Sequence, residues 1–165
     1  MNKTLLLPLF AAASLSVPLA APAQFGTSKV ATAHASARPA AIARGNKGLL
    51  TVILSVGPKY HVNANKPNDP AYIPTVFTPQ PAPGIQYGTI RYPAPKPMKL
   101  SYSPKPLLVY TGQVTVLVPF TVTQAARPGM LPLFGTVNFQ GCDTQSCFPP
   151  VSAPVRAVIA VIAVK

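Results

Sequence analysis

The sequence has 165 residues and a formal net charge of +12 at pH 7, because 14 Lys and Arg face only two acidic residues, Asp69 and Asp143. These aspartates are far apart in the sequence and there is no glutamate, so neither a paired-carboxylate hydrolase nor a triad with His34 or His61 is indicated. The cations are spread along the chain without a dense run. We interpret them as solvating the surface and allowing peripheral contact with a membrane, with no nucleic-acid role.

Residues 1–23 have the features of a cleaved signal peptide. Lys3 gives a positive start, residues 5–13 form an apolar run, and Ala21-Pro22-Ala23 has the small-x-small form of a cleavage site. The apolar run is too short to span a bilayer core of about 30 Å, which argues against a membrane anchor. We therefore expect a periplasmic or otherwise exported protein.

Residues 24–47 are rich in Ala, Ser, Thr and Gly, and we interpret them as a flexible leader. His34 lies in this leader and is expected to be solvated and not to bind a ligand. The remaining residues, 48–165, are enough for one domain with its own core.

From residue 49 onward the sequence has the pattern of β-strands. Residues 49–56 are rich in branched side chains and end at a Gly-Pro turn pair. Residues 113–123 alternate, with valines and Phe120 on one face and mainly threonines on the other, as expected when one face packs on a core. Prolines crowd residues 93–106 and forbid both a helix and a central strand there. Further short strands are predicted over residues 60–64, 72–77, 85–92, 131–140 and 154–164. The set predicts an all-β fold, an antiparallel β-sandwich.

The two cysteines, Cys142 and Cys147, flank a polar turn that is followed by two prolines. In an oxidising compartment such a pair is expected to form a disulfide. A bridge over so short a loop stabilises the fold by only about 2 kcal/mol in the chain-entropy estimate, so a purely structural role explains its position weakly. Short, exposed bridges are also the more labile ones. Residue types and spacing alone support redox exchange and a structural bridge about equally.

A metal site is a weaker alternative. Cys142, Cys147 and His61 are three candidate ligands, and Met98 or Met130 could add a soft ligand for Cu(I). The four ligands at regular spacing that a structural zinc site needs are missing. We expect no metal ligands and no cofactor other than a redox-active disulfide.

Four segments of the chain resemble the N-terminal periplasmic domain of the thiol:disulfide interchange protein DsbD. The segments are residues 60–67 (YHVNANKP), 73–75 (IPT), 91–93 (RYP) and 140–151 (QGCDTQSCFPPV). The last is the most specific, and the resemblance extends over about residues 48–165. We expect a mainly structural role for Tyr60, His61 and Asn63 in the first segment.

The resemblance implies an immunoglobulin-like sandwich in which Cys142 and Cys147 are the catalytic pair of a thiol:disulfide oxidoreductase component. Its implied partners are a membrane-embedded thiol reductant and periplasmic thioredoxin-like or disulfide-bearing proteins, which the chain would meet as a monomer. An aromatic cap loop shields the pair in the family, and Tyr102 in the proline-rich stretch is the best match. The alternatives are a non-enzymatic sandwich that binds a partner and holds a structural disulfide, and a Cu(I)-binding module.

Overall fold

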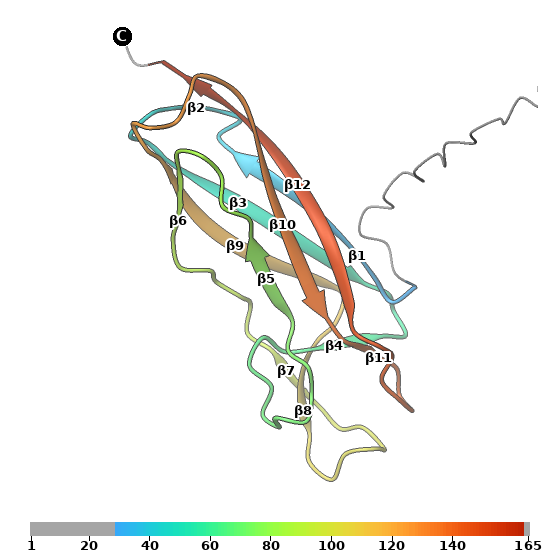
Figure 1. Cartoon of the computed structure of the whole chain (residues 1–165). Coiled ribbons are helices and arrows are strands. Elements are labelled where there is room, and N and C mark those ends of the chain that lie inside the picture. The colour runs from blue at the N-terminus through green and yellow to red at the C-terminus, as the bar shows by residue number, and fades with distance from the viewer. Residues whose placement is uncertain (1–28, 164–165) are drawn as a thin grey trace, which may run out of the picture.

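The structure is a computed structural model that describes residues 29–163, and these residues form strands and connecting segments without a helix (Figure 1). Within this range no helix is present that could cross a membrane. The twelve strands are β1 (Ala31–Arg38), β2 (Ala41–Ala43), β3 (Lys47–Val56), β4 (His61–Asn63), β5 (Val76–Pro79), β6 (Ile85–Tyr87), β7 (Lys96–Met98), β8 (Leu107–Tyr110), β9 (Gln113–Val122), β10 (Gly129–Phe139), β11 (Gly141–Cys142) and β12 (Val151–Ile162).

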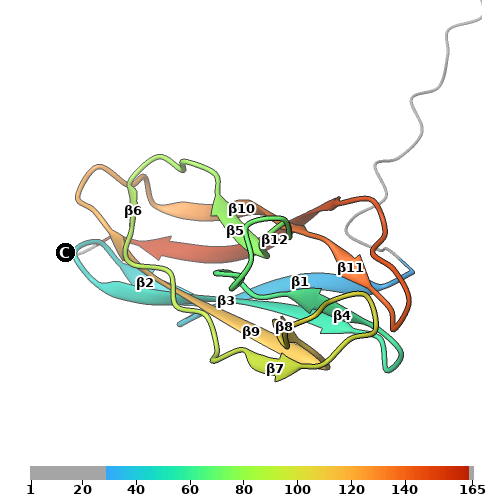
Figure 2. The same cartoon turned by 90° about the horizontal axis from the view of Figure 1, so that it is seen from below.

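Two four-stranded sheets form the body of the molecule. One has the order β1-β3-β9-β6 and the other β2-β12-β10-β5, and every pair is antiparallel except β2 with β12. Figure 2 shows the sheets as two layers, with β10 and β12 on one side and β1, β3 and β9 on the other. The predicted immunoglobulin-like β-sandwich is therefore confirmed.

Alternating side chains of both sheets share one apolar core. In β9 the residues Val114, Val116, Val118, Phe120 and Val122 are buried and their neighbours are not, so the predicted inward face of this strand is confirmed. Leu133, Val137, Val155 and Ile159 face them from β10 and β12. This period of two is what a half-buried strand requires.

A third, smaller sheet, ordered β11-β4-β8-β7, closes one end of the sandwich. It lies at the lower end of the molecule in Figure 1. Its edge strand β7 contains Pro97, in agreement with the prediction that the prolines of residues 93–106 exclude a central strand. The strand predicted over residues 85–92 is shorter than expected, because only 85–87 pair as a strand and Arg91 makes an isolated bridge.

The predicted flexible leader over residues 24–47 is wrong for most of its length. β1 pairs with β3 along its whole length, and β2 pairs with β12. The small alanines of β1 point inward and pack on the core while His34 is exposed. Alanine is depleted in strands and buries little apolar area, so the composition resembled a linker although the alternation was present. The predicted signal peptide, residues 1–23, lies outside the described residues.

Candidate functional site

The cysteine pair lies in the connection between the two longest strands. β10 and β12 pair as far as Phe139 and Val151, and residues 140–150 then extend beyond the sandwich toward the third sheet. Cys142 and Cys147 form a disulfide there, with an S–S distance of 2.04 Å and a Cα–Cα distance of 3.9 Å. Gly141 lets this segment pass close to the start of β1, because a Cβ at this position would overlap the side chain of Val30.

The turn between the cysteines is held by its own hydrogen bonds. The backbone N–H groups of Gln145 and Ser146 each donate to Asp143 Oδ1 at 2.8 Å, and the N–H of Asp143 donates to the carbonyl of Ser146 at 2.9 Å. These N–H donors stabilise the carboxylate and lower the pKa of Asp143. The turn is thus an ordered polar loop at the surface.

The two cysteines differ in how accessible they are to solvent. Cys142 is completely buried, with 0% of its surface exposed, and pairs with His61 in β4. Cys147 is only partly buried and is followed by exposed Pro149 and Pro150. An incoming group can therefore approach Cys147 more readily than Cys142.

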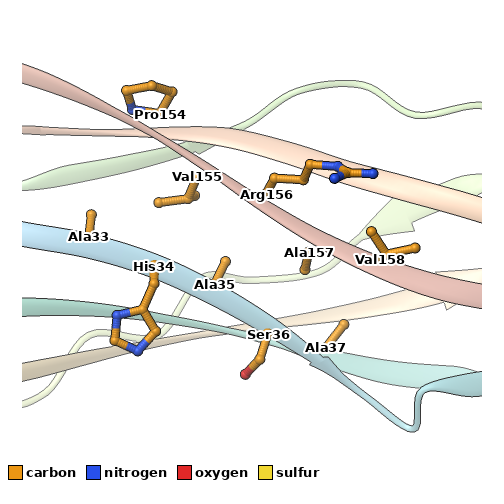
Figure 3. A pocket seen from close by; sticks show the side chains of 10 residues that line it. All are labelled: Ala33, His34, Ala35, Ser36, Ala37, Pro154, Val155, Arg156, Ala157 and Val158. Atoms are coloured by element: carbon orange, nitrogen blue, oxygen red, sulfur yellow. The ribbon is translucent and has the colours of Figure 1, made fainter. Parts of the chain in front are cut away.

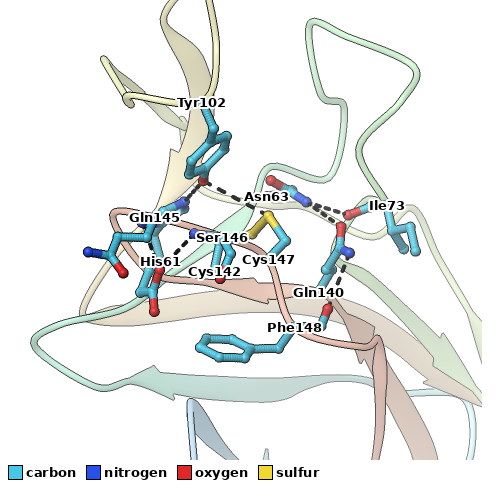
Figure 4. Close-up of a disulfide and its surroundings, with 11 residues drawn as sticks. His61, Asn63, Ile73, Tyr102, Gln140, Cys142, Gln145, Ser146, Cys147 and Phe148 are labelled. Atoms are coloured by element: carbon cyan, nitrogen blue, oxygen red, sulfur yellow. Dashed lines mark hydrogen bonds between the residues drawn. A yellow bond between two sulfur atoms is a disulfide. The ribbon is translucent and has the colours of Figure 1, made fainter.

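Tyr102 lies over the disulfide. Its hydroxyl oxygen is 3.9 Å from the sulfur of Cys147, a weak contact in which the disulfide sulfur has no hydrogen to donate. Figure 4 shows the ring of Tyr102 reaching toward the sulfurs, with the Asn63 and Gln140 side chains on another side of them. The residue predicted to shield the pair is thus placed beside it, and the shielding role stays a prediction.

The β7–β8 loop (residues 99–106) carries Tyr102 into this position. Leu100, Leu107 and Val109 form a small buried cluster of their own, against which Tyr102 and Tyr72 pack. Ser101 Oγ donates to the carbonyl of Thr144 at 2.9 Å and so joins the loop to the turn between the cysteines. The polar contacts that cross from this loop to the cysteine turn, from Ser101 and from Tyr102, are exposed or only partly buried.

His61 is buried beneath the tyrosine. Its Nε2 lies 3.0 Å from the Tyr102 hydroxyl, and only 3% of the residue is exposed. Burial lowers the pKa of His61, and the nearby charge of Asp143 partly opposes this effect. Burial is also the main cause that raises the pKa of Tyr102 to about 12, so the phenol is neutral. The prediction of a structural role for His61 did not anticipate its contact with Tyr102.

Two other members of the 60–67 segment, Asn63 and Tyr60, contact residues that flank the disulfide. Asn63 donates to the carbonyl of Ile73 at 3.0 Å and to Gln140 Oε1 at 3.3 Å. Gln140 in turn donates to the carbonyl of Phe148 at 3.2 Å, and the ring of Phe148 meets the edge of Tyr60. Sequence reasoning did not single out Gln140, although it is the first residue of the most specific segment.

Of the residues considered for Cu(I), His61 and the two cysteines lie close together, but Met130 does not join them. Met130 is 72% exposed near the start of β10, whereas Cys142 follows the far end of that strand. Met98 packs against the small cluster around Leu107. Residues 29–163 hold no group of three or more His, Cys, Asp or Glu side chains suited to a metal ion.

A hollow lies between β1 and β12 of the two main sheets, away from the cysteines. It has a volume of about 590 Å³ and runs between β1 and β12, with His34 on one side and Arg156 on the other (Figure 3). Its walls are mainly alanine and valine side chains. It contains no cysteine and does not reach the residues around Tyr102.

Fold and site together define a class of protein, a disulfide-bearing β-sandwich domain whose bridge lies in a surface turn. The chain belongs to the family described as Thiol:disulfide interchange protein DsbD, N-terminal, which matches residues 28–157. The match begins close to β1, in agreement with the finding that this strand is part of the domain. Membership and the Cys142–Cys147 disulfide together support a role in thiol–disulfide exchange.

The chain is similar to several solved structures at low sequence identity. The chain is similar to the Neisseria meningitidis DsbD N-terminal domain in the reduced form, with 19% identity and a TM-score of 0.43 over 65% of this chain and 74% of that chain. It is also similar to the seventh ScaB type I cohesin from Pseudobacteroides cellulosolvens, with 10% identity and a TM-score of 0.45 over 81% of this chain and 94% of that chain. No curated protein matches the sequence.

Proposed function

We propose that this protein is a periplasmic thiol–disulfide exchange module that passes reducing equivalents through Cys142 and Cys147. Its partners are a membrane-embedded thiol reductant on one side and periplasmic thioredoxin-like or disulfide-bearing proteins on the other. The protein acts as a monomer and uses no cofactor besides the disulfide. The observation that carries the proposal is a disulfide in a family of thiol:disulfide interchange proteins, with one sulfur-bearing residue partly exposed and the other buried.

The difference in accessibility between the two cysteines supports one order of events. A thiolate of the reducing partner attacks the sulfur of Cys147, a mixed disulfide forms, and Cys142 leaves as a thiolate. The second thiol of the partner then resolves the mixed disulfide and leaves Cys147 as a thiol or thiolate. Two electrons and two protons pass from the partner dithiol to the pair. The same steps in reverse reduce a disulfide in the next protein.

A structural role alone accounts poorly for the bridge. Its loop contributes only about 2 kcal/mol through the unfolded chain. The strands on either side of it are already paired from Gly129–Val161 to Phe139–Val151, so the bridge is not needed to hold them together. A bridge that adds little to the fold and has one partly exposed cysteine is better suited to repeated opening and closing.

Tyr102 is proposed to shield the pair between encounters. The ring packs on a cluster separate from the main core, and the hydrogen bond from Ser101 that joins its loop to the cysteine turn is exposed. A docking partner could therefore displace the loop without disturbing the sandwich. Displacement would expose the sulfur of Cys147.

Trapping tests the proposal directly. In Cys142→Ala the thiol of Cys147 can form a mixed disulfide but has no neighbour to resolve it, so envelope proteins should accumulate as covalent adducts. Cys147→Ala is the matched control and should trap far less, because Cys142 is buried. If neither variant forms adducts and the double variant still binds its partner, the protein is a binding module with a structural bridge.

A further inference from the structure

His61, the Tyr102 hydroxyl and the Cys147 sulfur form a chain of polar contacts that shielding alone does not explain. The distances are 3.0 Å from Nε2 to the hydroxyl and 3.9 Å from the hydroxyl to the sulfur. A phenylalanine ring would cover the sulfur equally well and would not need a buried partner for a hydroxyl group. Figure 4 shows that the Tyr102 hydroxyl stands between the imidazole and the disulfide.

A hydroxyl group has one hydrogen, so it can donate to only one of its two neighbours at a time. If Nε2 of His61 carries no hydrogen, the tyrosine donates to the imidazole and its oxygen lone pairs face the sulfur. If Nε2 carries a hydrogen, the imidazole donates to the tyrosine oxygen. The hydroxyl hydrogen is then free to point toward Cys147.

The surroundings of His61 favour the neutral imidazole in the disulfide form. The titratable groups that face it are Tyr102 from the β7–β8 loop, Asp143 from the turn after β11 and, once the bridge is reduced, Cys142 from β11. Burial is the larger influence and lowers the pKa of His61, while Asp143 raises it. Reduction adds a negative charge when Cys147 is a thiolate, and a nearby negative charge favours the imidazolium ion.

We propose that His61 is a positioning residue that takes up a proton on reduction and thereby turns the hydroxyl hydrogen of Tyr102 toward the thiolate of Cys147. This proposal rests on the proposed function. Of the two protons that accompany reduction, one then resides on His61 and the other on the thiol of Cys142. When Cys147 attacks a partner disulfide, the partner sulfur leaves as a thiolate and His61 releases its proton to that thiolate or to water. Cys142 loses the second proton as it closes the bridge, so electrons and protons balance.

The first test needs no variant. Nuclear magnetic resonance gives the pKa of His61 in the oxidised and in the reduced protein. The proposal predicts that the pKa of His61 rises on reduction, and the signal of His34, which is exposed on β1, serves as the internal reference. A pKa of His61 that is equal or lower in the reduced protein would overturn the proposal.

The second test measures the reactivity of the thiolate. In the Cys142→Ala background, the rate of alkylation of Cys147 by iodoacetamide is followed from about pH 5 to about pH 9, the range in which histidine and thiol groups titrate. Tyr102→Phe should lower the rate near neutral pH by about tenfold, because a hydrogen bond to a charged group is lost. His61→Gln retains a donor at the position of Nε2 but cannot titrate. It should keep a high rate and lose the histidine inflection.

Two matched controls accompany these variants. Tyr72→Phe removes a hydroxyl from the same small cluster, and His34→Gln removes the other histidine. Neither should change the pH profile. If Tyr102→Phe and His61→Gln also leave it unchanged, the proposal is wrong.

Reaction of the reduced two-cysteine protein with a small disulfide such as oxidised glutathione separates this proposal from the proposed function. If the protein exchanges with the disulfide while the pH profiles stay unchanged, only the role of His61 fails. If the protein does not exchange at all, the proposed function fails, and the shift in the His61 pKa still decides the positioning role.

Discussion

The sandwich body and the disulfide end of this protein are built on different principles. In the body, long strands pair without interruption, as in the nine residue pairs of β3 with β9, and their apolar side chains interlock between the sheets. At the disulfide end the strands of the small sheet are two to four residues long. A small separate apolar cluster and hydrogen bonds of the Asn63, Tyr102 and Asp143 side chains hold this end together.

Because of this difference, we expect the sandwich body to determine stability and the disulfide end to determine reactivity. Apolar burial in the body supplies most of the free energy of folding and fixes where residues 140–150 emerge. The disulfide end contributes less to stability, so its side chains are free to open, titrate and exchange. Substitutions in the body are therefore expected to change unfolding, and substitutions at the disulfide end are expected to change rates and pH profiles.

The largest effect is expected from Phe120→Ala in β9. The ring is 2% exposed and lies over Gly48, where a Cβ would overlap it. Truncation leaves a cavity between the sheets and should lower the free energy of unfolding by about 3–5 kcal/mol, measured by urea denaturation. Phe134→Ala, at a position 39% exposed, is the matched control and should lose much less. Equal losses in the two variants would contradict the distinction between body and surface.

A smaller loss is expected when the bridge is removed. Cys142→Ala/Cys147→Ala should lower the free energy of unfolding by about 2 kcal/mol, because only a short loop is released in the unfolded chain. The same denaturation experiment measures it. A loss as large as that of Phe120→Ala would mean that the bridge is a main support of the fold, and the comparison would then fail.

Removing the ring of Tyr102 should change the rate at which the disulfide is reduced and leave the free energy of unfolding almost unaltered. Tyr102→Ala removes the ring beside the Cys147 sulfur, so attack on the disulfide by a small thiol should become about tenfold faster, the equivalent of about 1.4 kcal/mol in the barrier. Stopped-flow reduction by dithiothreitol gives this rate. Tyr102→Phe keeps the ring and serves as control, with a rate close to that of the unchanged protein. No acceleration in Tyr102→Ala would show that the ring does not shield the bridge.

The smallest expected effect is the change in stability that Asp143→Asn causes, which should depend on pH. Since the pKa of this carboxyl is lowered in the folded state from the ordinary value of 3.8, its contribution to stability is present above that value and is lost as the pH falls through the folded pKa. Asp143→Asn should therefore be slightly less stable than the unchanged protein above about pH 4, and the gap should close at lower pH. Thermal unfolding across this range measures the gap, with Asp69→Asn as control. A gap that widens in acid would contradict the assigned hydrogen bonds.

The two regions also differ in how far the sequence predicts them. The alternation of β9 is strong because its valines and Phe120 contrast with threonines, and its inward face was predicted residue by residue. β1 has the same alternation, but its inward residues are alanines whose burial depends on β3 and β12 lying beside them. Short-range patterns cannot supply that tertiary context.

At the site, the sequence located the two cysteines and pointed to Tyr102, but only the fold brings the tyrosine to the sulfur. His61 is 41 residues from Tyr102 in the chain, and the contact depends on the pairing of β4 with β8 and β11. The spacing of residue types shows neither this pairing nor the different burial of Cys142 and Cys147. Both follow from the way β10 continues into β11 and crosses to the small sheet.

The central claim is that the Cys142–Cys147 bridge is exchanged and does not serve only to hold the fold. Its reduction potential, measured by equilibration with glutathione buffers, tests this claim most directly. We predict a value above about −300 mV, in the range of disulfides that thiol proteins of the envelope can reduce and re-form. A value well below about −300 mV would mark a structural bridge and contradict the proposed function.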